Sequence, residues 1–329
     1  MIKFFSSGYL SRYILLLIFG VLIWAPSLIL PSSYTGISSF AFNQISYLTA
    51  DNNLVLTILS FALTMVSALL LNQIAITNGF SGKVSTLIAF LFILLTSSLV
   101  TEFHNNPVIW INFALIFVIG SLMRLPYVNN TIPVVFNASF ILGLASLFYS
   151  QLVFLILFIW ISIIIHRVVS LRNLVVSIIG IVLPYFFLLT LFFSMDILLE
   201  ESYVLFDSLQ IDITPVFITD PIEIVISIIL LSITIISAFG IIGRLTEKNI
   251  NLRRNLIITL FYAAIVFTVL LFFSKSIITV LLLVIPSVLI IGHWLGSLRR
   301  TRWFNLALSL VVILIIINQY LYLLFRLLD

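Results

Sequence analysis

Uncharged apolar runs long enough to cross a lipid bilayer recur along the whole chain. One of them, VVFNASFILGLASLFYSQLVFLILFIWISIIIH, covers residues 134–166 without a charged side chain. A membrane helix needs about 20 apolar residues, because each adds about 1.5 Å across a hydrocarbon layer about 30 Å thick. Only 8% of the residues are charged, against roughly 25% in soluble domains. The sequence therefore predicts an all-α, polytopic transmembrane bundle.

No stretch is both long and polar enough to form a separate soluble domain, so residues 1–329 are interpreted as one integral-membrane domain. We expect about eleven spans, within a range of about ten to twelve. The first span is expected to remain uncleaved, because no small-residue cleavage site follows it. The spans are predicted near 13–30, 54–75, 84–101, 108–123, 132–149, 151–166, 174–195, 221–242, 255–273, 277–296 and 304–324.

The distribution of basic residues predicts the orientation. If the N-terminus is cytoplasmic, all but Lys275 and Arg326 of the 15 Lys and Arg residues fall on the cytoplasmic side. Such an excess of positive charge on cytoplasmic loops is the usual pattern of membrane proteins. The C-terminus is then periplasmic. We expect a multi-pass protein of the bacterial inner membrane with lipids as partners, and the confined basic charge argues against a nucleic-acid partner.

The same rule divides the long apolar run into two crossings. Arg124 and Arg167 should both be cytoplasmic, so an even number of crossings must separate them. Residues 125–166 provide enough length for two thin spans. The sequence therefore predicts a hairpin that turns at FYSQ, residues 148–151.

Small and polar residues inside this run share one helical face, since Ser139, Gly143 and Ser146 are spaced four and three apart. Small residues allow a second helix to approach closely, and close packing drives helix association in lipid. The face is therefore interpreted as a helix–helix contact. The alternative is a groove for a lipid or isoprenoid tail, with Asn137, Ser139, Gly143 and Ser146 as candidate lining residues.

The most hydrophilic segment is the predicted periplasmic loop 196–220, which carries six carboxylates and no basic residue. Its spacing matches no known metal-binding loop, so no metal site is predicted. A solvated acidic cap is one interpretation. An ion site or a docking surface for other envelope membrane proteins is the alternative, with Glu200, Glu201, Asp207 and Asp212 as candidates.

A second constellation consists of Asp51 in the first predicted external loop and Glu102 and His104 in the second. This placement resembles integral-membrane glycosyltransferases of the GT-C type. The resemblance implies a general base and metal ligands that act on a polyprenyl-phosphate sugar donor. The first loop is much shorter here, and no compact acidic pair is present. Ordinary polar loop residues are the alternative interpretation.

The remaining sequence contains no nucleotide-binding, hydrolase or dinucleotide motif, and no cofactor is predicted. The three histidines, His104, His166 and His293, are dispersed. His166 follows a predicted span and precedes Arg167, so it is interpreted as a boundary residue.

The segment FNASFILGLASLFY, residues 136–149, fits the pattern F-(D/N)-A-x-F-x-x-G-x-A-S-L-F-Y. It is followed by Arg172 and Asn173 in a basic turn, and then by Gly180, Pro184, Tyr185 and Phe186. With these features residues 55–190 resemble the DUF6427-type family of multi-pass inner-membrane proteins of Bacteroidota. The resemblance implies a Gram-negative inner-membrane protein and implies no activity. Asn137 stands where that family often has Asp.

Three hypotheses for function follow. The first is a non-catalytic subunit or scaffold in cell-envelope biogenesis, because catalytic motifs are missing and an acidic loop is available for docking. The second is a GT-C-like transferase that uses Asp51, Glu102 and His104. The third is a transporter of a lipid or another apolar solute.

Overall fold

The computed structural model describes residues 10–31, 40–49, 52–82, 85–98, 105–196, 221–273, 277–298 and 302–328. Every regular element in these ranges is a helix, which confirms the predicted all-α fold for this part of the chain. The elements are α2 (Leu10–Ile29), α3 (Phe40–Leu48), α4 (Asn53–Thr77), α5 (Leu87–Thr96), α6 (Pro107–Met123), η2 (Leu125–Tyr127), α7 (Ile132–Ser146), η3 (Ser150–Leu155), α8 (Ile156–Ile165), α9 (Leu171–Ser194), α11 (Pro221–Ile242), η4 (Leu245–Glu247), α12 (Ile250–Phe273), η5 (Ile277–Leu283), α13 (Val284–Ser297) and α14 (Arg302–Leu328).

Seven helical segments of the described chain are long and apolar enough to cross a membrane. They are Arg12–Ile29, Asn53–Thr77, Pro107–Tyr127, Leu171–Ser194, Ile250–Phe272, Thr279–Ser297 and Trp303–Leu324. Four shorter apolar helices accompany them: Leu87–Thr96, Ile132–Ser146, Ser150–Ile165 and Leu231–Ile242.

One end of the bundle, here called the basic end, unites the C-termini of α4, α6 and α8 with the N-termini of α7, α9 and α12. The Asn255 side chain donates to Asn78 Oδ1 at 3.1 Å, and Asn251 donates to the Tyr127 hydroxyl at 3.1 Å. Thr131 and Asn173 are hydrogen-bonded across the starts of α7 and α9. The residues that make this end basic are Arg124, Arg167, Arg172, Arg244, Lys248, Arg253 and Arg254.

Other contacts join the opposite helix ends. Trp24 Nε1 in α2 donates to Ser97 Oγ, just after α5, at 3.0 Å. Gln319 Nε2 in α14 donates to the Ser97 carbonyl at 3.2 Å. Asn105 Nδ2 donates to the Asn53 carbonyl at 3.4 Å. The helices from α4 to α9 therefore run in alternate directions between the two ends.

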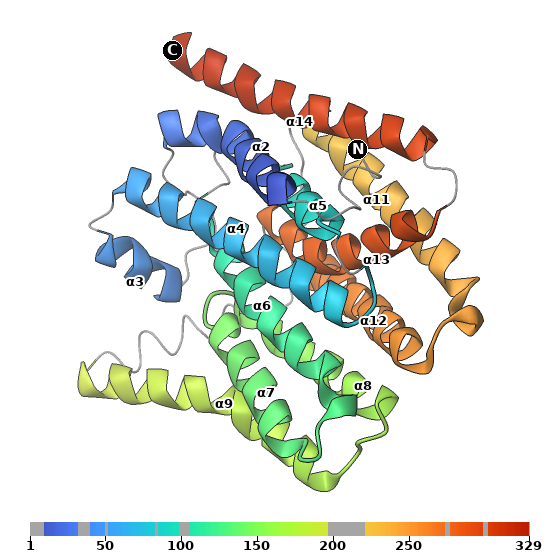
Figure 1. The fold of residues 1–329 in the computed structure, drawn as a ribbon. Helices are drawn as coiled ribbons and strands as arrows, with labels where there is room; N and C mark the ends of the chain where they lie inside the picture. The colour runs from blue at the N-terminus through green and yellow to red at the C-terminus, as the bar shows by residue number, and fades with distance from the viewer. Residues whose placement is uncertain are drawn as a thin grey trace.

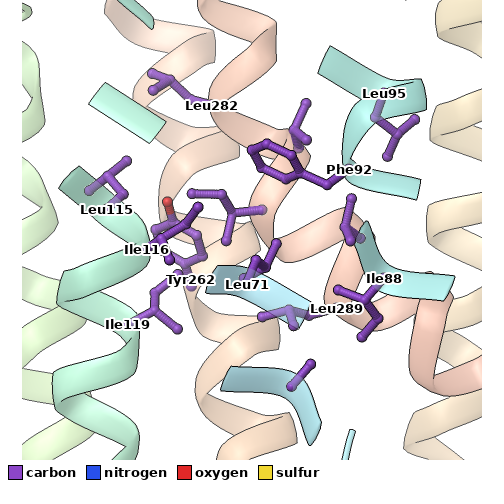
Figure 2. Packing of buried hydrophobic residues seen from close by; sticks show 14 of the residues in the cluster. Leu71, Ile88, Phe92, Leu95, Leu115, Ile116, Ile119, Tyr262, Leu282 and Leu289 are labelled. Atoms are coloured by element: carbon purple, nitrogen blue, oxygen red, sulfur yellow. The ribbon is translucent and has the colours of Figure 1, made fainter. Parts of the chain in front are cut away.

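The core is centred on α5, whose ten residues, Leu87–Thr96, are all buried. Figure 2 shows side chains of α4, α6, α12 and the η5–α13 segment gathered on one side of Ile88, Phe92 and Leu95 of this helix. Gly292 of α13 lies so close to α5 that an added Cβ would come within 2.9 Å of Ile88 Cγ1. This short apolar helix is thus enclosed by protein rather than by solvent or lipid.

The outer helices have the opposite pattern, with large apolar side chains on the surface. Figure 1 shows α9 and α14 at opposite edges of the bundle. On α9, Phe186 and Phe187 are 59% and 55% exposed, and on α14 Ile313 is 55% exposed. Soluble monomers rarely expose contiguous apolar surface of this kind, whereas a lipid-facing helix requires it.

Helix α3 was not expected, because residues 31–53 were interpreted as a loop. Its sequence, FAFNQISYL, buries Phe42 and exposes Tyr47 and Leu48. An apolar segment of nine residues is too short to cross a bilayer and too apolar to stay in water. Such a helix is suited to the membrane–water interface, and the loop interpretation overlooked it for this reason.

Candidate functional site

The bundle contains a cavity of about 360 Å³ between α11, α12 and the η5–α13 segment. Its wall is almost entirely apolar, with Leu260, Ala263 and Phe267 contributed by α12. Leu231, Ile235 and Val280 line the cavity and are 38–47% exposed at the surface of the bundle. The cavity therefore opens sideways, toward the surroundings of the helices.

Pro286 explains the irregular backbone on one side of this cavity. A proline has no N–H to donate and its ring crowds the carbonyl four residues earlier. Residues 277–283 accordingly form the 3₁₀ helix η5 before α13 begins. Asn112 Nδ2 of α6 donates to the Leu281 carbonyl at 3.0 Å and anchors this segment. The Asn112 contact and the proline together hold Val280, Leu281 and Leu283 along the cavity wall.

Three hydroxyl groups interrupt the apolar lining: Ser98, Thr234 and Ser287. Ser98 Oγ donates to the Leu95 carbonyl at 2.7 Å, which ties it to the end of α5. The cavity therefore combines apolar walls with a few polar groups, a pattern typical of sites that bind an apolar ligand in a fixed orientation.

The small-residue face of residues 139–146 lies against α9. A Cβ added at Gly143 would lie 2.8 Å from the Ile181 carbonyl oxygen and 2.9 Å from Pro184 Cγ. A Cβ added at Gly180 would collide with Ser139 Oγ. Ser139 and Ser146 are buried and return their hydroxyls to carbonyls of their own helix, whereas Asn137 is exposed. These contacts support the helix–helix interpretation of this face rather than a lipid groove.

Two of the predicted sites lie outside the described residues. Asp51, Glu102 and His104, the candidates for transferase chemistry, belong to this part of the chain. So do Glu200, Glu201, Asp207 and Asp212 in the acidic segment, of which only Asp196 is described. The transferase and docking hypotheses therefore stay predictions.

His166, interpreted from the sequence as a boundary residue, is only 4% exposed. Neither of its ring nitrogens has a hydrogen-bond partner among the described residues. Burial and the nearby Arg254 guanidinium lower the pKa of His166 to about 4. The imidazole is thus neutral at pH 7, while the Arg254 guanidinium in the same basic end carries a charge.

His293 on α13 is also buried, but its surroundings differ. Its Nδ1 lies 2.9 Å from the Phe80 carbonyl oxygen, just after α4. The Phe80 ring also meets its imidazole edge-on. This hydrogen bond gives His293 a structural role, because it satisfies Nδ1 and the Phe80 carbonyl, although Nε2 has no partner within the described residues. His166 has no such explanation within the described residues.

The backbone fixes His166 at the end of α8. The Val168 N–H donates to the Ile163 carbonyl and the Arg167 N–H donates to the Ile164 carbonyl. This is the Schellman arrangement, in which the residue after the cap takes a left-handed conformation. Arg167 occupies that position with φ 61°. Asn173 Nδ2 then donates to the Val168 carbonyl at 2.8 Å and holds the turn against α9.

Within the described ranges, no group of three or more His, Asp or Glu side chains is placed to bind a metal ion. Compared with protein-family models, curated proteins and solved structures, the chain matches none of them. The resemblance to the DUF6427-type family stays a prediction, and the interpretation of the site depends on its geometry.

Sequence reasoning overlooked both the lateral cavity and the buried His166. The cavity is formed by helices distant in the sequence, and its lining residues look like ordinary span residues. For His166 a signal existed: a histidine beside an arginine at one helix end, with the pair Arg253 and Arg254 near the start of another. Only the packing of α8 against α12 unites them.

Proposed function

We propose that this chain is a multi-pass protein of the bacterial inner membrane that binds a lipid by its hydrocarbon chain, in the class of lipid or apolar-solute transporters. The observation that carries the proposal is the lateral apolar cavity between α11, α12 and α13. An unfilled void forfeits dispersion contacts on all its walls, so a cavity open to the bilayer is best occupied by a flexible apolar chain. The hydroxyls of Ser98, Thr234 and Ser287 would select among such chains.

The proposed topology has eleven crossings, with the N-terminus in the cytoplasm and the C-terminus in the periplasm. Its support is the sum of the seven long and four shorter apolar helices, together with the alternating helix directions. The basic end faces the cytoplasm in this topology, as the positive-inside rule requires. The shorter helices would cross the membrane surrounded by other helices of the protein, as the complete burial of α5 illustrates.

Reporter fusions test this topology directly. Fusions at Ser150 and at Asp207 are both expected to report a periplasmic location. A cytoplasmic signal at Ser150 would remove the hairpin of α7 and α8 and reduce the number of crossings.

Lipid retention tests the cavity. Protein extracted in a mild neutral detergent is expected to retain one lipid molecule in native mass spectrometry. Ala263→Phe places an aromatic ring in the cavity and is expected to abolish this retention. Leu271→Phe is the matched control, because Leu271 lies on the same helix, is 58% exposed and does not line the cavity.

Equal lipid retention by the wild type and Ala263→Phe would reject the cavity as the lipid site. The scaffold hypothesis makes a different prediction, namely stable co-purification of other envelope proteins in a native pull-down. Loss of such partners upon deletion of residues 197–220, with lipid retention unchanged, would favour the scaffold.

A further inference from the structure

The N-terminal turns of α12 carry an unbalanced positive charge. Arg253 and Arg254 lie in the second turn, and the first turn contains no acidic residue. The unpaired N–H groups of a helix N-terminus already favour an anion there, and carboxylates are the residues usually found at this position. Two arginines at the N-terminus of a helix therefore increase the positive potential instead of reducing it.

No carboxylate of the described chain compensates this charge. Glu247 in η4 is the acidic residue nearest in sequence, and it is exposed. Arg254 is half-buried, and its side chain forms no hydrogen bond or salt bridge within the described residues. A half-buried guanidinium has five N–H donors to satisfy, so an external acceptor is the natural partner.

His166 provides a second, independent indication of a ligand. It is nine-tenths or more buried, lies at the end of α8, which packs against α12, and has two ring nitrogens without a partner in the described part of the chain. Its neutral imidazole has one N–H to donate. Burial of an unsatisfied donor is unfavourable, and a bound acceptor would recover this loss of free energy.

We propose that His166, Arg254 and the N-terminal turn of α12 bind the phosphate group of an anionic membrane phospholipid at the basic end of the bundle. A phosphate diester offers oxygen acceptors to a guanidinium fork, to an imidazole N–H and to helix amides. The basic end would lie at the cytoplasmic leaflet, where anionic lipids concentrate. A phospholipid of this leaflet can therefore reach the site with its headgroup while its hydrocarbon chains stay in the membrane.

This site is separate from the lateral cavity. Leu260, Ala263 and Phe267 lie six, nine and thirteen residues after Arg254, which at about 100° per residue puts them on the opposite side of α12. Arg254 is on the side near His166 and α8. The inference therefore goes beyond the proposed function, and variants can separate the two sites.

The test measures the shift in thermal unfolding midpoint caused by a short-chain phosphatidylglycerol in a neutral detergent. Wild type is expected to be stabilised more by this lipid than by the matched phosphatidylcholine. Arg254→Gln and His166→Gln are each expected to weaken the apparent affinity about tenfold or more, as the loss of one charge-assisted hydrogen bond implies. Arg254→Lys, which keeps the charge but loses the guanidinium fork, is expected to lie between.

Arg172→Gln is the charge control, because it removes one positive charge from an exposed position at the same end. It is expected to leave the affinity nearly unchanged, and so is Ala263→Phe in the lateral cavity. Monodisperse elution shows that each variant is folded, and wild-type lipid retention in the cavity shows the same for the variants of His166, Arg172 and Arg254. If Arg172→Gln and Arg254→Gln weaken binding equally, only general electrostatic attraction is present and the site is rejected.

Inorganic phosphate distinguishes the source of the anion. It is expected to compete with the lipid only weakly, because the bilayer supplies no anchor for a free ion. If inorganic phosphate stabilises the protein as strongly as the lipid, and Arg254→Gln removes this effect, the assignment to a phospholipid is wrong.

Discussion

The C-termini of α4 and α8 have the same backbone arrangement, yet they differ in how completely their side chains are satisfied. After α4, Gly79 takes the left-handed position with φ 78°, and Phe80 and Gly79 donate to Ala75 and Ile76. After α8, Arg167 takes the equivalent position. Both ends are near consecutive residues of α12, since Asn78 bonds Asn255 and His166 lies by Arg254. The Asn78–Asn255 pair is a structural contact, whereas the His166–Arg254 pair is incomplete without the proposed ligand.

The difference teaches how to distinguish a structural helix end from a functional one. At α4, glycine removes the steric penalty of the left-handed conformation, and Asn78 also donates to the Ile74 carbonyl at 2.8 Å. At α8 the chain retains an arginine where glycine is favoured and buries a histidine without a partner in the described residues. A sequence selected for stability alone would not keep both features, and strained positions of this kind concentrate at functional sites.

The largest effect is expected from Asn78→Ala. This change removes the acceptor of Asn255, a residue that is 1% exposed and whose Oδ1 already has no partner in the described chain. The free energy of unfolding is expected to fall by about 2 kcal/mol. His166→Leu should change it by less than about 1 kcal/mol in lipid-free detergent, because it removes an unsatisfied group. Unfolding by sodium dodecyl sulfate in mixed micelles measures both, and equal losses would contradict the distinction.

A smaller effect is expected when α4 is given the sequence of α8 at the left-handed position. Gly79→Arg introduces a side chain at φ 78°, which is unfavourable by about 1–2 kcal/mol. Space is not limiting, since an added Cβ would meet only Leu252 Cδ1, at 3.8 Å. The same mixed-micelle titration measures the loss, and an unchanged midpoint would show that conformation at this turn is not restrictive.

The reverse exchange, Arg167→Gly, is expected to stabilise the protein by about 0.5–1 kcal/mol, because it relieves the left-handed arginine. A gain in stability without phosphatidylglycerol, together with unchanged lipid affinity, would show that Arg167 is not part of the anion site. A loss of stability would mean that the Arg167 side chain makes a contact worth more than the strain.

The smallest effect near neutral pH is expected from the titration of His166. Its pKa is about 4 in the folded protein and about 6.5 when unfolded, so below pH 6.5 the unfolded chain takes up a proton that the folded chain does not. The lipid-free protein should therefore lose stability as the pH falls from about 6.5 toward 4. The difference between wild type and His166→Gln in the mixed-micelle titration isolates this component. Identical pH profiles would show that the environment of His166 is not as described.

The fold class could be predicted from the sequence because a bilayer makes simple demands on each helix separately. Length and apolar character identify the long helices without reference to their neighbours. A helix contact on this face of α7 was also predictable, since the spacing of Ser139 and Gly143 places small residues on one face, but its partner α9 was not. Helix α3 was missed because an interfacial helix satisfies neither the criterion for a span nor that for a loop.

The candidate sites could not be predicted in the same way, because each depends on contacts between distant segments. The lateral cavity needs the 3₁₀ segment before Pro286 to lie beside α11 and α12. The anion site needs the end of α8 to meet the start of α12. An apolar residue does not by itself indicate which helix it contacts. In a sequence that is 63% hydrophobic, the tertiary contacts therefore could not be predicted from the residue types.

The complete burial of α5 has a consequence for the order of assembly. This helix precedes α13 in the chain, yet α13 forms one of its walls, through Gly292 and Ile88. A ribosome therefore releases α5 into the membrane long before its permanent neighbour exists. Until α13 is synthesised, the positions that α13 later covers must be shielded by lipid, by the insertion machinery or by α4. The core of this protein is thus completed last, from its C-terminal side, although its central helix is among the first to be made.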